Sequence, residues 1–200
     1  MSQAVPPLDL VIVTGAGRGI GRAIALQAAR HAASVLCISR SANCIETARA
    51  IRQTGGSADS LQADLAAFSE TGRAVMDWLR TRNHQRIGIV LAAGSLGPSG
   101  PLADTSLEEW DATWRTNVLG NLAVVQACLP ILRANRFGRL LFFAGGGAAY
   151  AYPLFPAYAA TKTALVRAIE NLHLDLKDQG DFAVTILAPG AVETEMLATV

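Results

Sequence analysis

Tyr158 and Lys162 have side chains that could transfer a proton, and they lie four residues apart in a predicted helix, residues 158–178. Because four residues make about one helical turn, both side chains lie on one face, with the lysine ammonium next to the phenol. A nearby positive charge favours the phenolate and lowers the pKa of the tyrosine from about 10 toward working pH. The pair could therefore give a proton to a carbonyl oxygen or take one from an alcohol. An ordinary pair of helix-surface residues would show the same spacing.

Residues 14–21 form a second motif, Thr-Gly-Ala-Gly-Arg-Gly-Ile-Gly, between a short apolar run and a predicted helix. Glycines at such a turn let backbone N–H groups approach a pyrophosphate at the positive end of the helix, because a Cβ would hold the phosphate away. Tight turns use the same residues, but this position between a strand and a helix favours a dinucleotide site. The predicted contacts are Gly15, Arg18, Gly19, Ile20 and Gly21, of which Gly21 also lets the helix pack closely on the sheet.

The end of the second predicted strand indicates which dinucleotide binds. NAD-binding proteins usually place Asp or Glu there to accept a hydrogen bond from the ribose 2′-OH. Here Ser39 and Arg40 hold the position, so no carboxylate repels a 2′-phosphate, and the planar guanidinium of Arg40 suits one. Arg18 could approach the phosphate from the other side. NADP is therefore predicted over NAD, and the alternative is that both arginines are solvated surface residues.

The elements that would position these residues follow from an alternation of short apolar runs with longer amphipathic stretches. The predicted strands are residues 8–13, 34–39, 57–62, 87–92, 139–143 and 182–187. The predicted helices are residues 19–31, 44–54, 68–82, 107–135 and 158–178, and Pro130 is expected to kink or break the fourth. The fold class is α/β: one Rossmann-type, doubly wound parallel sheet of about six strands, in a single domain that spans residues 1–200.

The motifs and their order resemble those of the short-chain dehydrogenases/reductases over essentially the whole chain. The family's TGxxxGxG loop appears as residues 14–21. Its adenine-contacting Asp matches Asp64, which is followed by Leu65, although Asp64 could equally cap the turn after the third strand. Its Asn-Asn-Ala-Gly motif after the fourth strand keeps only Ala93 and Gly94.

The resemblance also implies roles for residues near the nicotinamide. In the family, hydride moves to or from the nicotinamide ring while the tyrosine of the YxxxK signature, here residues 158–162, handles the proton. Asn117 matches the catalytic Asn, which helps hold a water that links the lysine to solvent; a helix cap or core amide is the ordinary alternative. Residues 189–194 resemble the PGxVxT segment that lies along the nicotinamide. Its implied contacts are Pro189, Gly190, Val192 and Thr194, the threonine touching the carboxamide.

One family residue is missing. In relatives a serine about thirteen residues before the tyrosine hydrogen-bonds the substrate oxygen, and counting back from Tyr158 gives Gly145. Residues 142–148 contain no Ser or Thr, so a shifted alignment does not restore the hydroxyl. Losing one such donor typically costs about 100- to 1,000-fold in rate.

Neighbouring groups could replace the serine. Tyr150 or Tyr152 could supply a hydroxyl, or Gly146 and Gly147 could present backbone N–H groups. Aromatic walls of a pocket are the more ordinary use of such tyrosines.

The given sequence ends at Val200, where relatives usually continue into a helical loop that covers the substrate and a seventh strand. Without that continuation the substrate site would lose most of its lid, and water exclusion around the hydride would suffer.

Composition narrows the partners and the compartment. The net charge is +1 and the basic residues are scattered, so neither nucleic acid nor a membrane surface is an expected partner. Cys37, Cys44 and Cys128 lack CxxC spacing and fit reduced thiols of a cytoplasmic protein. Residues 1–7 lack the basic and apolar regions of a secretory signal, and the uncharged run 140–161 is interrupted by glycines and prolines that fit a strand and loop. No metal site is expected.

The predicted function is an NADP(H)-dependent oxidoreductase that interconverts a ketone or aldehyde and its alcohol. The expected pocket, between residues 95–101 and 145–155, is apolar and aromatic and lacks a cation, so the substrate is expected to be neutral and fairly hydrophobic. The alternative is a dinucleotide-binding pseudoenzyme that serves as a sensor or subunit partner. Relatives pair the helices corresponding to residues 107–135 and 158–178 across two-fold axes, which implies a homodimer or homotetramer.

Overall fold

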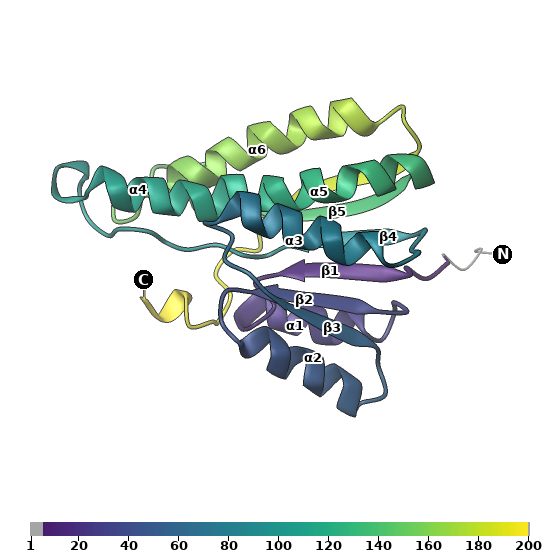
Figure 1. Cartoon of the computed structure of the whole chain (residues 1–200). Helices are drawn as coiled ribbons and strands as arrows, with labels where there is room; N and C mark the ends of the chain where they lie inside the picture. Colours follow the sequence, from purple (N-terminus) through teal and green to yellow (C-terminus); the bar gives the residue numbers. More distant parts are fainter. Residues whose placement is uncertain (1–5, 200) are drawn as a thin grey trace.

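The computed structural model describes residues 6–199, in which six strands form one parallel sheet in the order β3-β2-β1-β4-β5-β6 (Figure 1). The strands are β1 (Leu10–Thr14), β2 (Val35–Ser39), β3 (Ala58–Gln62), β4 (Ile87–Leu91), β5 (Phe137–Phe143) and β6 (Asp181–Leu187). The predicted α/β fold class and the number of strands are confirmed. The expectation about a secretory signal concerns residues 1–7, of which residues 1–5 lie outside the described residues.

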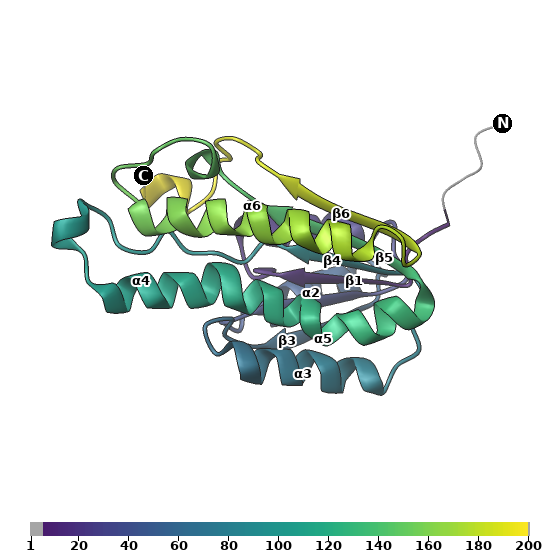
Figure 2. The same cartoon turned by 90° about the horizontal axis from the view of Figure 1, so that it is seen from above.

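Helices cover the sheet in two layers. On one face lie α1 (Gly19–Ala28) and α2 (Asn43–Gln53); on the other lie α3 (Phe68–Arg80), α4 (Leu107–Trp114), α5 (Gly120–Asn135) and α6 (Pro156–Leu176), as Figures 1 and 2 show. Successive side chains of a strand point to opposite faces. Leu10 and Ile12 of β1 therefore join the core under α3 and α5, whereas Val11 and Val13 join the core under α1 and α2.

Most predicted boundaries agree with the structure to within one to three residues. The first helix ends at Ala28 and not at residue 31. The fifth strand begins at Phe137, two residues before the predicted start. The last helix begins at Pro156, where proline is favoured because the first helical N–H has no intrahelical partner.

Of the two expected effects of Pro130, a kink or a break, the break does not occur. Pro130 lies inside α5, which continues to Asn135. The irregular part is a π-helical turn at Arg115–Leu119, which joins α4 to α5. The combined helix, Leu107–Asn135, has the length and hydropathy that a membrane span would need, yet α5 packs on α3 and much of its apolar surface lies in the core.

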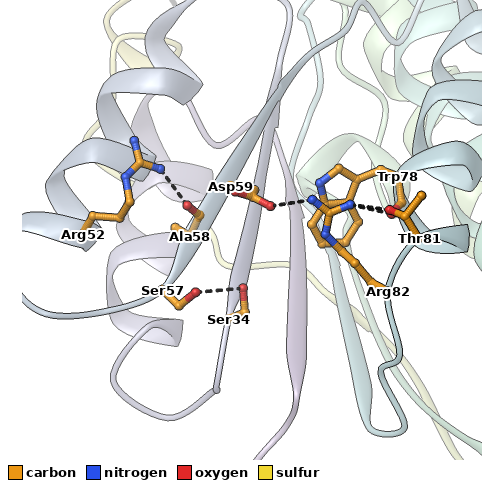
Figure 3. A network of polar contacts seen from close by, with 8 residues as sticks. All are labelled: Ser34, Arg52, Ser57, Ala58, Asp59, Trp78, Thr81 and Arg82. Atoms are coloured by element: carbon orange, nitrogen blue, oxygen red, sulfur yellow. Dashed lines mark hydrogen bonds and ion pairs between the residues drawn. The ribbon is translucent and has the colours of Figure 1, made fainter.

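Polar contacts fix the edge strand β3 between its two neighbouring helices (Figure 3). Arg52 of α2 donates to the carbonyl of Ala58 over 2.6 Å. From the opposite side, Arg82 pairs with Asp59 at 3.1 Å and lies over the Trp78 ring, 4.0 Å from its centroid. These contacts hold the strand whose end carries Asp64.

The opposite edge of the sheet is less covered. Along β6 alternate residues are exposed, among them Ala183, Thr185 and Leu187. A hollow of about 350 Å³ lies on this face between Ile24 of α1 and Thr185 of β6.

Candidate functional site

All six strands run in the same direction, so their carboxyl ends meet at one edge of the sheet. The strand order reverses between β1 and β4, and open α/β sheets bind ligands in the crevice at such a switch point. The glycine loop follows β1, Ser39 ends β2, Gly94 follows β4 and Gly145 follows β5. The topology therefore brings the predicted site residues to one edge.

The glycine loop fits tightly against the turn that follows β4. Gly15 has φ +67°, and a Cβ there would come within 2.9 Å of the backbone of Ala93. A Cβ on Gly21 would collide with the carbonyl of Gly15. The loop is also tied to β2, because the N–H of Ala16 donates to the carbonyl of Ile38 over 3.0 Å. Both glycines are thus required by close backbone approach.

The first turn of α1 is suited to an anion. Arg18 occupies the N-cap with no side-chain hydrogen bond to the helix, and the first turn contains no acidic residue. Gly17 and Ile20 are partly exposed, and Arg18 and Gly19 are exposed. Helix N-terminal N–H groups carry positive charge and bind phosphate. The residues present therefore fit the pyrophosphate of a dinucleotide.

The end of β2 faces this loop. A Cβ on Gly17 would lie 3.0 Å from Oγ of Ser39, whose hydroxyl donates to the carbonyl of Ser41. Arg40 is exposed and forms no ion pair within residues 6–199. Its guanidinium is thus available to a charged ligand.

Asp64 and Leu65 lie where β3 ends. Oδ1 of Asp64 accepts from the N–H of Ala66 at 3.0 Å, so the turn-capping interpretation is confirmed. The side chain of Leu65 is buried in the core against Gly120, which leaves only its backbone for contact with a ligand.

Asn117, in the π-helical turn, is fully buried and connects three segments. Its Oδ1 accepts from the N–H of Ser95 at 2.7 Å, and its Nδ2 donates to the carbonyl of Ser95 and to Oγ1 of Thr161. A Cβ on Gly94 would lie 3.3 Å from Oδ1 of Asn117 and 3.7 Å from Nζ of Lys162. The structure therefore brings Gly94, Asn117 and Lys162 together, and the core-amide interpretation describes the side chain of Asn117.

The sequence analysis missed Asn121, a buried amide one turn after Asn117. Its Nδ2 donates to the carbonyls of Ala93 and Asn117, at 3.2 and 2.9 Å. Its Oδ1 accepts from the hydroxyl of Thr14 at 3.4 Å. Asn121 thus links the ends of β1 and β4 to α5. The available signal was an amide four residues after another amide, on the same face of an apolar helix.

Tyr158 lies against Gly145. A Cβ on Gly145 would be 2.7 Å from the phenol oxygen, so the phenol occupies space that a side chain at position 145 would need. The ring of Tyr152 packs beside it with centroids 6.4 Å apart, which agrees with the pocket-wall interpretation, whereas Tyr150 is 79% exposed. Gly146 and Gly147 begin a short 3₁₀ turn, Gly146–Ala148.

The charge state of the pair differs from the prediction. Burial raises the pKa of Tyr158 above its usual 10, with a further contribution from Tyr152. Burial also lowers the pKa of Lys162 to about 8. Its Nζ donates to the carbonyl of Phe143 over 2.7 Å and lies 5.4 Å from the centroid of the tyrosine ring. The expected lowering of the tyrosine pKa is therefore wrong for this structure, because burial and the neighbouring Tyr152 both raise it.

The segment after β6 folds back toward the glycine loop. Residues 189–194 follow the strand, and Oγ1 of Thr194 accepts from the N–H of Leu197 at 3.3 Å. Arg18, predicted to approach a 2′-phosphate, pairs instead with Glu195 at 2.7 Å. Pro189, Gly190 and Val192 thus lie in a segment that reaches the coenzyme loop.

The two segments expected to border the substrate pocket are joined by a backbone hydrogen bond, in which the N–H of Gly100 donates to the carbonyl of Leu154 over 2.9 Å. The hollow beside β6 contains none of the predicted site residues. We therefore place the candidate site by its chemistry, at Tyr158. Residues 6–199 contain no group of three or more His, Cys, Asp or Glu side chains arranged for a metal ion.

A parallel sheet with a glycine loop and an open helix terminus at its switch point defines a Rossmann-type dinucleotide-binding domain. The sequence model of the short chain dehydrogenase family matches residues 9–200. The chain belongs to the short-chain dehydrogenase/reductase family, whose members are oxidoreductases that use nicotinamide dinucleotides.

Individual relatives agree with this assignment. The chain is 30% identical to a probable tetrahydroxynaphthalene reductase of Zymoseptoria tritici, over 94% of the chain and 69% of the relative. It is 31% identical to an NADPH-dependent aldehyde reductase-like chloroplastic protein of Arabidopsis thaliana, over 98% and 78%. Among solved structures, one similar protein comes from Beutenbergia cavernae and is provisionally assigned as an NAD(P)-dependent gluconate 5-dehydrogenase, with NADP bound at low occupancy. It superposes with a TM-score of 0.87 at 31% sequence identity, and the match covers 95% of this chain and 75% of that one.

Proposed function

We propose that this protein is an NADP(H)-dependent oxidoreductase that interconverts a carbonyl and an alcohol, with Tyr158 as the proton donor and acceptor. The observation that carries the proposal is the position of Lys162, whose Nζ lies 5.4 Å from the centroid of the Tyr158 ring and close to Gly94. Ala93, the residue before Gly94, packs against Gly15 of the glycine loop. A nicotinamide coenzyme bound there would supply or accept the hydride.

The protein's own groups then manage the proton. The raised pKa of Tyr158 keeps the phenol protonated at neutral pH, so it donates to a carbonyl oxygen that gains negative charge. Lys162 has a pKa of about 8 and is therefore largely charged at pH 7, next to the phenolate that forms. Its hydrogen bond to Phe143 holds the ammonium in place. Asn117 fixes the loop at Ser95 to the helix of the tyrosine through Thr161.

NADP is the proposed coenzyme. Support comes from Arg40, which is exposed and unpaired within residues 6–199 at the end of β2, and from the NADP bound to the Beutenbergia cavernae relative. Ser39 leaves that position without a carboxylate.

A dinucleotide-binding pseudoenzyme is the second candidate function. The specific observation in its favour is Gly145, which leaves no serine or threonine hydroxyl between residues 142 and 148. A developing oxyanion would lose that donor.

Substitution of Tyr158 decides between these candidates. NADPH oxidation is followed with a panel of neutral ketones, aldehydes and quinones for the natural chain and for Tyr158→Phe. We expect the variant to be slower by at least about 100-fold, the effect of one positioned acid. Tyr150→Phe is compared with it, because Tyr150 was a candidate for the missing hydroxyl; since Tyr150 is 79% exposed, we expect this variant to retain the full rate. Equal rates for the natural chain and Tyr158→Phe would contradict the assignment.

The remaining proposals concern substrate, assembly and location. The ring of Tyr152, which packs beside Tyr158 and against Phe155, suits a neutral, apolar substrate. Leu107 and Leu174 are 74% and 58% exposed on α4 and α6, which supports pairing of these helices in a homodimer or homotetramer. Free, buried cysteines suit a cytoplasmic protein.

A further inference from the structure

The ion pair between Arg18 and Glu195 joins two parts of the chain that are 177 residues apart. Arg18 is the N-cap of α1, and Glu195 belongs to the segment that follows β6. The same segment comes near the loop at a second point, because the position that a Cβ on Gly19 would take lies 3.4 Å from the methyl group of Thr194. Residues 194–195 thus lie beside the start of α1, where the ion pair connects them to it.

The two arginines predicted to recognise a 2′-phosphate are therefore not equivalent. Arg40 has no ion pair within residues 6–199, whereas Arg18 already has a carboxylate 2.7 Å from its guanidinium. The side chains of Arg18 and Glu195 are 63% and 72% exposed, so solvent screens the pair and its strength is modest. A doubly charged phosphate can compete with such a contact.

We propose that Glu195 sets the preference between phosphorylated and unphosphorylated coenzyme by competing with the 2′-phosphate for Arg18. This inference rests on the proposed function. A carboxylate at Arg18 repels a phosphate that approaches the same guanidinium, so NADPH must displace Glu195 or bind beside its charge. NADH carries a neutral hydroxyl at that position, so it meets the charge of Glu195 only at the pyrophosphate, which both coenzymes share. Glu195 therefore opposes NADPH more strongly than NADH.

Dissociation constants for NADPH and NADH, measured by fluorescence titration of the full chain at low salt, test the proposal. Glu195→Gln is expected to tighten NADPH binding about two- to fivefold, the range for an exposed ion pair, and to tighten NADH binding clearly less, because NADH has no 2′-phosphate. The effect of Glu195→Gln on NADPH affinity should disappear near 1 M salt, where the Debye length is only about 3 Å. Glu193→Gln is the matched control, because Glu193 is exposed in the same segment and has no hydrogen bond or ion pair within residues 6–199.

The Arg18→Gln variant distinguishes competition for the Arg18 guanidinium from a general effect of the negative charge of Glu195. Removing Glu195 there should have no effect on NADPH binding, because the contested guanidinium is gone. The inference is overturned if Glu195→Gln weakens NADPH binding or changes the affinities for NADPH and NADH by the same factor. It is also overturned if Glu193→Gln changes NADPH affinity as much as Glu195→Gln does, or if Glu195→Gln has the same effect in the Arg18→Gln background. Absence of binding of either coenzyme to every variant would instead overturn the proposed function.

Discussion

At position 145 the absence of a side chain has a direct steric effect on the reactive tyrosine. The phenol oxygen of Tyr158 lies 2.7 Å from where a Cβ on Gly145 would stand. Real Cβ atoms do not come so close, so any larger residue must displace the phenol or the backbone. Gly145 therefore does more than remove a hydroxyl, because it also defines where the tyrosine sits.

We predict that Gly145→Ala lowers the turnover number for carbonyl reduction by about tenfold to 100-fold, because a displacement of the acid by roughly 1 Å has effects of this size. The dissociation constant for NADPH should stay unchanged. Gly145→Ser carries the same Cβ, so the ratio of its rate to that of Gly145→Ala measures the hydroxyl alone. A turnover number of Gly145→Ala equal to that of the natural chain would show that Tyr158 does not need the space.

Lys162 should make the free energy of unfolding depend on pH. Burial lowers its pKa from the usual 10.5 to about 8 in the folded protein. Between these pH values the unfolded chain holds a proton that the folded chain has released, so stability contributed by this residue rises as pH increases. We predict that urea unfolding from pH 7 to 9.5 shows this rise in the natural chain and that Lys162→Met lacks it. Parallel stability curves for the two proteins would contradict the assigned pKa.

At the scale of elements, the junction of β1, α1 and β4 sets the geometry of the coenzyme loop. Gly15 combines a φ of +67° with an approach of 2.9 Å to Ala93. Gly55, which follows α2, has a φ of +85° but no atom within 4 Å of its Cβ position. The two glycines share the left-handed backbone conformation, but only at Gly15 would an added Cβ collide with neighbouring atoms.

We predict that Gly55→Ala lowers the free energy of unfolding by about 1–2 kcal/mol, the cost of the left-handed conformation. Gly15→Ala should lower it by roughly 1–3 kcal/mol more, because the added methyl group overpacks the contact with β4. Coenzyme binding should weaken only in Gly15→Ala. Denaturant unfolding and NADPH titration measure both effects, and equal stabilities of the two variants would refute the crowding argument.

The periodicity of apolar residues was enough to predict each strand and helix, since burial on two faces of a sheet imposes it directly. The π-helical turn at Arg115–Leu119 could not be predicted that way, because it leaves no mark on the apolar periodicity, and its Asn117 bonds Ser95 and Thr161 in distant segments. Pro130 does not end the helix for a related reason, since packing of α5 on α3 overrides the local preference of one residue.

The site shows the same division between local and distant information. The glycine loop and the Tyr158–Lys162 spacing are local patterns and were visible in the sequence. The pairing of Arg18 with Glu195 joins residues 177 positions apart, and the raised pKa of Tyr158 depends on burial. Neither the ion pair nor the raised pKa produces a recognisable pattern among residues that are close in the sequence.

At the scale of the whole molecule, the sheet separates two apolar cores, and each core contains at least one cysteine. Cys37 in β2 and Cys44 in α2 belong to the core under α1, and Cys128 in α5 belongs to the core under α3. All three are free and buried. Burial raises the pKa of Cys37 and Cys128 to about 12.

We therefore predict that Ellman's reagent does not react with the native protein on the timescale of minutes, because all three thiols are buried and burial disfavours the reactive thiolate form of Cys37 and Cys128. Three thiols per chain should react in denaturant. If the two cores unfold cooperatively, the three thiols should become reactive at one denaturant concentration. Release of one or two thiols before the others would show that the cores open separately.

The central place of β1 in the sheet has a consequence for how the protein is made. β1 pairs with β2 on one side and with β4 on the other, and residues 87–91 of β4 are synthesised long after residues 10–14. One edge of β1, with the turn that follows it, therefore stays open while the intervening chain emerges from the ribosome. Glu195 is translated later still, so the nascent chain displays Arg18 without the partner that accompanies it in the finished protein.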